Sequence, residues 1–181
     1  FQDNLNDSSG NGLDGSWGDG NIGNFIDGAE SRAVKLNGGF IKVPDNPLLD
    51  GMNELTVSVW AKRNALDSYG FLVHKENAYH IWIVNEGRNY GTVFARVYTQ
   101  NGTTYVNKFL AKIEDTKWHH YAMTYDGAYI RLFIDGIEHP TPKALTEVVE
   151  DTDTDLLIGK GDDRHHGRGA DIRFDGSIDE V

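Results

Sequence analysis

Apolar and polar residues alternate in short stretches along this chain, and turns rich in Gly, Asn and Asp separate the stretches. In the clearest stretch, 55–62, every second residue from Leu55 to Ala61 is apolar, which places these side chains on one face of a strand. Comparable stretches predict strands at 71–73, 79–84, 92–98, 105–111, 118–125, 129–138, 156–159 and 174–181. No window of a dozen residues keeps a helical apolar spacing without a Gly or a β-branched run, so long helices are not expected.

Dipeptides between these stretches predict hairpins. Asn101-Gly102, Asp126-Gly127 and Asp135-Gly136 combine residue types that tolerate a positive φ, as tight turns between strands require. Strands that recur about every 8–12 residues are typical of an all-β sandwich or barrel. The run 144–149 is compatible with either a helical turn or an edge strand.

The length of 181 residues suits one domain with a two-layer core, and no repeat, linker or boundary divides the sequence. We therefore expect residues 1–181 to form a single domain. The chain begins with Phe1 and stops at Val181 within a strand-like pattern, so we expect it to be a piece of a larger secreted or surface protein.

The balance of charge limits the partners that the chain can bind. The net charge is −11, which repels nucleic acid backbones and anionic lipid and suits cations, neutral sugars or basic protein surfaces. The sequence has no Cys, which excludes thiol catalysis, disulfides and zinc–thiolate sites. It also has no run near the about 18 apolar residues of a membrane helix, so membrane insertion is not expected.

Both ends of the chain carry oxygen ligands suited to a hard cation. The loop 7–15 places short oxygen-bearing side chains between glycines, and the last predicted strand carries the carboxylate of Asp179 among apolar neighbours. Calcium takes six to eight oxygens, and a buried carboxylate is costly unless it is paired or bound to metal. If the terminal strands are neighbours in one sheet, they can share a structural Ca²⁺, whose candidate ligands are Asp7, Asn11, Asp14 and Asp179. The alternative is that these residues simply form turns.

Six segments, in this order, resemble motifs of the laminin G-like (LamG-like) jelly-roll domains of the concanavalin A-like lectin/glucanase superfamily. They are Asn6–Gly12, Ala33–Pro44, Leu55–Lys62, Trp118–Gly127, Leu132–Gly136 and Gly176–Val181. The resemblance implies a two-sheet antiparallel β-sandwich, and many members carry one calcium near the joined termini. Members usually act as lectin-like, adhesive or accessory modules of extracellular proteins, so the resemblance implies an extracellular or cell-surface location.

Aromatic and planar polar side chains on the middle strands are the candidates for ligand binding. Sugars present apolar faces that stack on aromatic rings and hydroxyls that pair with polar side chains. The candidates are His80, Trp82, Arg88, Tyr90, Arg96 and Tyr98. The alternative is that Trp82 and Phe94 belong to the core, since large aromatic side chains usually are buried. Trp17, in a Gly-rich loop, is either a second sugar platform or a lid over the edge of the core.

Two His pairs also bear candidate chemistry. His119 and His120 lie within a predicted strand, and we expect a structural hydrogen bond there rather than catalysis. His165 and His166 lie in a Gly- and charge-rich loop, for which we expect a solvated loop rather than a transition-metal site. A sugar-contacting role of that loop is the intermediate interpretation.

The sequence does not favour catalysis. Glycoside hydrolysis needs two carboxylates about 5–10 Å apart, and no apolar strand carries acids at alternate positions. Nucleophile elbows, phosphate loops and zinc motifs are also missing. We therefore predict a non-catalytic, calcium-stabilised module that binds a glycan or cell-surface polysaccharide. The alternatives are a structural or adhesive domain that contacts protein or self-associates, and a polysaccharide lyase or glycoside hydrolase.

Overall fold

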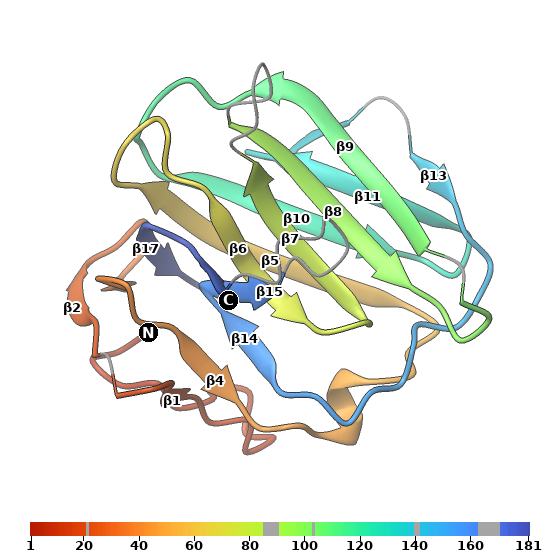
Figure 1. Ribbon diagram of the computed structural model, residues 1–181, viewed down its shortest axis with the longest axis horizontal. Helices are drawn as coiled ribbons and strands as arrows, with labels where there is room; N and C mark the ends of the chain where they lie inside the picture. Colours follow the sequence, from red (N-terminus) through yellow and green to blue (C-terminus); the bar gives the residue numbers. More distant parts are fainter. Residues whose placement is uncertain (21, 85–90, 103, 140–141, 163–170) are drawn as a thin grey trace.

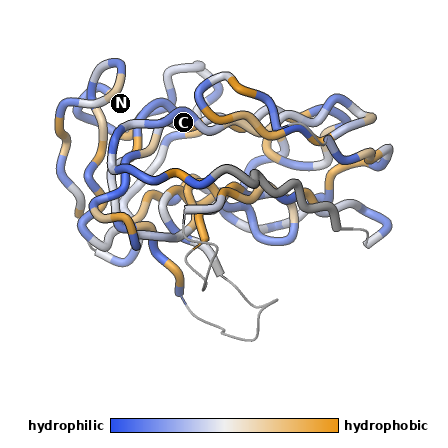
Figure 2. Tube along the Cα trace, turned by 90° about the horizontal axis from the view of Figure 1, so that it is seen from above, coloured by the Kyte–Doolittle hydropathy of each residue, from blue (hydrophilic) through white to orange (hydrophobic). Residues whose placement is uncertain are grey.

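The computed structural model describes residues 1–20, 22–84, 91–102, 104–139, 142–162 and 171–181, with the side chains of 104–111 and 162 left out of the description. The chain is an almost entirely β protein built from two large sheets, which confirms the predicted fold class. Figure 1 looks onto the first sheet, with the second behind it, and Figure 2 shows the two layers from the edge. One turn of 3₁₀-helix, η1 (Pro47–Leu49), is the helical element of the described residues.

The first sheet has seven strands, which we call sheet A. In spatial order they are β1 (Ser16–Trp17), β4 (Ile41–Val43), β14 (Leu156–Ile158), β6 (Gly70–Lys75), β7 (Tyr79–Val84), β8 (Thr92–Tyr98) and β9 (Thr104–Lys112). All of its pairs are antiparallel.

The second sheet, sheet B, has eight strands. Seven follow the order β12 (Ile137–Glu138), β11 (Tyr129–Ile134), β10 (His119–Tyr125), β5 (Leu55–Arg63), β17 (Gly176–Asp179), β3 (Arg32–Lys35) and β2 (Asn24–Asp27). The eighth, β13 (Lys143–Ala144), pairs with β11, so the predicted run 144–149 begins at an edge strand rather than a helical turn. A separate hairpin joins β15 (Lys160–Asp162) to β16 (Asp171–Arg173).

Alternation along the strands builds the core between the sheets. In β5 the side chains of Val57, Val59 and Ala61 are buried, while Thr56 and Lys62 are exposed, as the sequence pattern predicts. The inward positions of sheet A are filled in the same way by aliphatic and aromatic side chains of β7 and β8. Trp17 packs against this core, which supports its interpretation as a lid over the core edge.

The hairpin between β10 and β11 shows why a predicted turn forms where it does. The Asp126 carboxylate accepts hydrogen bonds from the backbone N–H groups of Ala128 (3.0 Å) and Tyr129 (2.7 Å). Gly127 has a φ of 78°, a conformation that costs glycine little. The Asp126 side chain thus accepts hydrogen bonds from two backbone N–H groups of the turn.

Buried cations tie the ends of the strands to the connecting loops. The Lys75 ammonium, with a side chain that is 0% exposed, lies 2.7 Å from Asp45 and 3.2 Å from Asp50 and donates to the carbonyl of Thr154 (2.5 Å). The Arg63 guanidinium donates to the carbonyls of Leu66, Ile113 and Asp115. Both charges are therefore compensated, as buried charges must be.

The His pair of β10 has the predicted structural character. Nδ1 of His119 lies 2.7 Å from the Asp135 carboxylate, and Nε2 lies 2.8 Å from that of Asp115. The ring therefore joins the β9–β10 connection to the turn after β11. The His120 ring packs on Trp60 of the neighbouring strand, with 5.3 Å between ring centroids.

The segments near the two ends of the chain meet in sheet B. The last strand, β17, lies between β5 and β3, so that Ile178 pairs with Val34 and with Ala61. The prediction placed the first and last strands side by side, whereas β17 pairs with β3 and β5, and β1 pairs with β4 in the other sheet. Both marked ends lie at the same end of the molecule in Figures 1 and 2.

Candidate functional site

The outward side of strands β6, β7 and β8 carries a cluster of rings, which we call the outer face. It consists of Phe71, His74, His80, Trp82, Phe94, Arg96 and Tyr98. Registration of β7 against β8 creates the cluster, because His80 lies opposite Arg96 and Trp82 lies opposite Phe94. Four of the six predicted ligand residues thus share one face, namely His80, Trp82, Arg96 and Tyr98.

The partly exposed members of this cluster form a platform, defined here as Trp82, Phe94, Arg96 and Tyr98. The rings of Trp82 and Phe94 stack with 4.9 Å between centroids and 15° between planes. The guanidinium carbon of Arg96 lies 4.9 Å from the Trp82 centroid, a cation–π distance, and Nη1 donates to the Tyr98 hydroxyl at 3.1 Å. Within the described residues no carboxylate pairs with Arg96, so its charge is held by aromatic rings rather than by an acid.

His80 lies beside the platform, two residues before Trp82 on the same face of β7. It is 3% exposed, with its ring centroid 4.6 Å from that of Trp82, and it stacks on His74, which is 4% exposed. Phe71, opposite Trp82 on the neighbouring strand, lies 5.2 Å from the His80 ring. Buried rings therefore pack against Trp82 along its own strand and from β6.

The hairpin β15–β16 covers one end of the outer face. Gly161 lies so close to Phe71 that a Cβ there would be 2.3 Å from the ring, which only a glycine avoids. The predicted ligand residues Arg88 and Tyr90 lie outside the described residues, as do His165 and His166.

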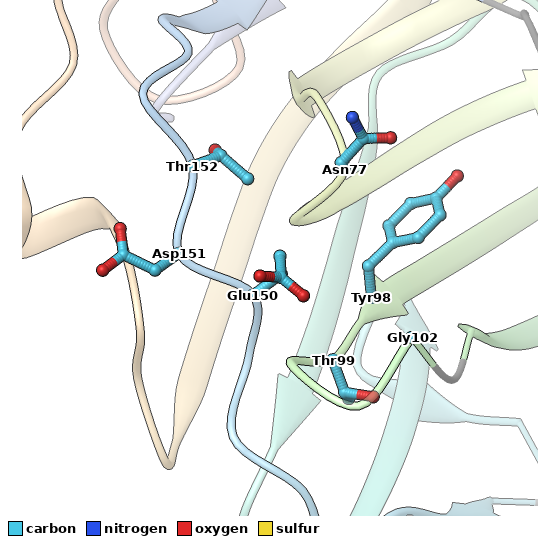
Figure 3. Close-up of a pocket in the computed structure, with 7 residues that line it drawn as sticks. All are labelled: Asn77, Tyr98, Thr99, Gly102, Glu150, Asp151 and Thr152. Carbon is cyan, nitrogen blue, oxygen red and sulfur yellow. The ribbon is translucent and has the colours of Figure 1, made fainter.

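A pocket of ≈ 380 Å³ lies at the other end of the face. It is lined by Asn77, Tyr98, Thr99, Gly102, Glu150, Asp151 and Thr152 (Figure 3). Tyr98 belongs both to the platform and to this pocket. The remaining lining residues come from the β6–β7 turn, the β8–β9 turn and the connection before β14.

Sequence reasoning missed several members of this site. A β-bulge between Phe71 and Val73 decides which side chains of β6 face outward, and nothing in the local pattern announces it. Phe94 did carry a signal, because it stands two residues before Arg96 in a strand. The pocket residues had none, since three separate segments meet there.

The family model Laminin_G_3, described as the concanavalin A-like lectin/glucanases superfamily, matches residues 16–181. The chain belongs to this superfamily. A comparison with curated protein sequences found no match.

Solved structures share the fold of this concanavalin A-like chain. Domain 4 of AbnA, a GH43 extracellular arabinanase from Geobacillus stearothermophilus solved with arabinotriose, is 24% identical with a TM-score of 0.73, covering 97% of this chain and 84% of that one. The botulinum neurotoxin serotype D ligand-binding domain, solved with N-acetylneuraminic acid, is 18% identical with a TM-score of 0.60, covering 95% of this chain and 42% of that one. The botulinum neurotoxin DC binding domain, solved with rat synaptotagmin II, is 14% identical with a TM-score of 0.60, covering 98% and 44%.

Three of the four predicted calcium ligands of this concanavalin A-like chain share one loop. The Asp7 carboxylate accepts hydrogen bonds from the N–H groups of Ser9 (2.8 Å), Asn11 (3.1 Å) and Leu13 (3.1 Å) and from the Ser9 hydroxyl (2.7 Å). The bond from the Ser9 side chain is the main reason that the pKa of Asp7 is lowered. Asp14 accepts the Asp7 N–H at 2.8 Å. The loop is thus held together by its own donors.

Asp179, the fourth predicted ligand, lies at a different turn. Its buried carboxylate accepts the N–H groups of Ala29 (2.9 Å), Glu30 (3.3 Å) and Glu180 (3.0 Å). All three partners are backbone N–H donors, which an ionised carboxylate accepts. Among the described residues, no three His, Asp or Glu side chains converge into a metal site. Asp7, Asn11 and Asp14 lie in the loop 7–15 and Asp179 lies in β17, and a calcium ion shared between these two places stays a prediction.

Proposed function

We propose that this chain is a non-catalytic carbohydrate-binding module of an extracellular protein. The observation that carries the proposal is the platform on sheet A, where Trp82 and Phe94 present stacked, partly exposed rings beside the Arg96 guanidinium. Rings supply apolar surface for the faces of sugar units, and Arg96 and Tyr98 supply hydrogen-bonding groups. The likeness to an arabinanase domain solved with arabinotriose and to a neurotoxin domain solved with N-acetylneuraminic acid supports this ligand class.

The same surface argues against hydrolysis of the bound sugar. Among the described residues, the outward positions of β7 and β8 carry no carboxylate, while glycoside hydrolysis requires two that flank the bond. Glu150 and Asp151 are neighbours in an extended segment, and Figure 3 shows their carboxylates turned to opposite sides. They therefore cannot flank one bond in this arrangement.

An extracellular setting is part of the proposal. The AbnA domain with this fold belongs to an extracellular arabinanase, which supports this part of the proposal. No helix of the described residues is long and apolar enough to cross a membrane.

Glycan-array binding tests the proposal, with two tryptophan variants as a matched pair. Trp82→Ala removes the platform, whereas Trp60→Ala removes a partly buried indole on the outward side of sheet B. We expect saturable binding of one sugar class that Trp82→Ala weakens by about 30-fold or more, as for the loss of a central aromatic contact. Trp60→Ala should leave binding unchanged at a comparable loss of stability.

A protein partner is the alternative function, and it has a structural precedent in the neurotoxin domain solved with synaptotagmin II. If no sugar on a glycan array binds and the protein self-associates in analytical ultracentrifugation, the protein-binding function replaces the carbohydrate proposal. Equal loss of sugar binding in both tryptophan variants would move the site away from the platform.

A further inference from the structure

The pocket at the end of β8 continues the platform. Tyr98 is common to both, and the His80 ring lies between the two regions, with centroids 4.6 Å from Trp82 and 5.9 Å from Tyr98. The Arg96 guanidinium carbon, 4.9 Å from the Trp82 ring and 5.8 Å from the Tyr98 ring, spans the same gap. A chain-like ligand that lies on Trp82 and passes over Tyr98 therefore reaches the pocket.

The far wall of the pocket is held in place by backbone hydrogen bonds. Glu150 N–H donates to the Tyr98 carbonyl (3.0 Å), Gln100 N–H donates to Val148 (3.2 Å), and Val149 N–H donates to Met52 (3.0 Å). These bonds fix the segment before β14 against the end of β8. A wall that is already ordered loses little conformational entropy when a ligand binds.

The buried Lys75 ammonium anchors the next part of this wall. Its Nζ lies 3.4 Å from the Thr152 carbonyl and 3.2 Å from the Asp50 carboxylate, which in turn accepts the Thr152 N–H at 3.3 Å. Thr152 is thereby held through both of its backbone groups. The pocket is a preformed feature of the fold, as small-ligand sites usually are.

The lining of the pocket is polar, with one aromatic ring. Asn77 offers an amide, Thr152 a hydroxyl and Glu150 a carboxylate, and Figure 3 shows the Glu150 side chain turned toward the side of Tyr98 and Thr99. A carboxylate accepts hydrogen bonds from hydroxyl or ammonium groups and repels another carboxylate. Such a lining suits a neutral or amino sugar and disfavours a uronic acid.

We propose that this pocket is a second subsite for the same glycan, in which Glu150 accepts hydroxyl donors from the sugar unit beyond Tyr98 and rejects uronic acids. This inference rests on the proposed function of the platform. It adds that the ligand is an oligosaccharide rather than a single sugar, and that charge at one position of that chain decides its selection.

Binding of neutral and of uronic acid oligosaccharides, measured by calorimetry and on arrays, tests the subsite. The neutral probes are arabino- and galacto-oligosaccharides, the uronic acid probes are oligogalacturonides, and each series runs from the monomer to the hexamer. For the wild type we expect affinity to rise with length until both subsites are filled, and neutral chains to bind better than uronic acid chains of the same length. The uronic acid penalty should shrink at high salt, because salt screens the repulsion.

Variants of Glu150 separate the pocket from the platform. Glu150→Gln should raise the ratio of uronic acid to neutral binding by about tenfold, and Glu150→Lys should raise it further. Glu147→Gln and Glu147→Lys, at an exposed position outside the pocket, serve as controls and should leave the ratio unchanged. Trp82→Ala should weaken binding of every chain length.

Each outcome decides between the two proposals. Loss of binding in Trp82→Ala with an unchanged ratio in both Glu150 variants would overturn the subsite and leave the platform in place. Absence of sugar binding by the wild type would overturn both. An equal shift in the Glu147 variants would mean that overall charge, rather than the pocket, sets the selectivity.

Discussion

The outward sides of the two sheets follow the same alternation and carry different chemistry. On sheet A the outward positions of β7 and β8 hold contiguous rings, with Trp82 stacked on Phe94. On sheet B, Trp60 pairs with His120, and small polar residues such as Thr56 and Thr124 lie opposite each other. The fold requires only that inward positions be apolar, so the outward positions are where one member of the superfamily differs from another in function.

Two arginines show the difference in chemistry between the outward sides of the two sheets. Arg131 on sheet B stacks on Tyr129 at 5.3 Å, but its charge is also paired with Asp126 and with Glu138. Arg96 on sheet A stacks on Trp82, and no acid among the described residues pairs with it. A cation–aromatic pair therefore occurs on both sheets, and among the described residues acids pair with Arg131 but not with Arg96, whose charge can face a ligand.

The largest difference that we expect between the two sheets is in the free energy of unfolding, when the buried ion pair of Lys75 in sheet A is removed. Lys75→Met should destabilise the protein by about 3 kcal/mol, because it leaves the largely buried carboxylate of Asp50 without its cation. Lys62→Met, at an exposed position of sheet B, should change stability by less than about 0.5 kcal/mol. Urea unfolding measures both. Equal effects would show that the Lys75 cluster contributes nothing particular.

Removal of calcium is the next test, and it concerns the end of sheet B where β17 carries Asp179. If the predicted structural ion is present, EDTA should lower the unfolding free energy by about 2.7 kcal/mol for a protein kept at 100 times its Kd for calcium. Thermal melts before chelation, after it and after readdition of Ca²⁺ give the answer. An unchanged melting temperature would reject the ion and leave Asp179 as the hydrogen-bond acceptor of the turn at 28–30.

Substitution of either stacked arginine by lysine tests the comparison through sugar affinity, and we expect a smaller change in free energy than for Lys75→Met. Arg96→Lys keeps the charge but loses the planar group that covers Trp82 and reaches Tyr98, so we expect about tenfold weaker sugar binding. Arg131→Lys is the control and should bind as the wild type does. Calorimetric titration compares them, and equal affinities for all three proteins would remove Arg96 from the site.

The smallest effect concerns the pH dependence of stability near His119. Burial lowers the pKa of this imidazole, but hydrogen bonds to Asp135 and Asp115 raise it more, so the pKa lies above its ordinary value. The protonated ring therefore stabilises the fold fully below the pKa of the unfolded chain, and this contribution is lost as pH rises through the folded value.

Melting temperatures of the wild type and His119→Gln should accordingly converge as the pH is raised from about 6 to about 9. Asp135→Asn removes one partner of the ring and should reduce the same pH-dependent difference. A gap between wild type and His119→Gln that widens with pH would contradict the assignment.

The sequence was informative wherever structure follows from local pattern. Alternation located β5, β7 and β8, and Asp-Gly pairs located the turn after β10 and the one that splits the run 129–138 into β11 and β12. The same period of two placed His80 and Trp82 on one face of their strand, while whether that face was core or surface stayed open. These features depend on neighbours in the sequence, which is why they could be read from it.

What could not be predicted depends on contacts between distant segments. The register of β7 against β8 decides that Arg96 lies beside Trp82, and a bulge in β6 brings Phe71 to the other side of Trp82. Asp179 accepts donors from Ala29 and Glu30, at the opposite end of the sequence, and no spacing near Asp179 reveals them. For the same reason the pocket beside Tyr98 had no signature.

Indole N–H resonances offer the most direct test of the claim that the outer face of sheet A binds a glycan. The chain has four tryptophans, so a ¹⁵N-correlated spectrum contains four such signals, which single substitutions assign. Titration with the oligosaccharide that binds best should shift the Trp82 signal in a saturable way and leave the Trp60 signal in place. A Trp82 signal that stays unchanged while the sugar binds, or a shift at Trp60 in its stead, would contradict the account.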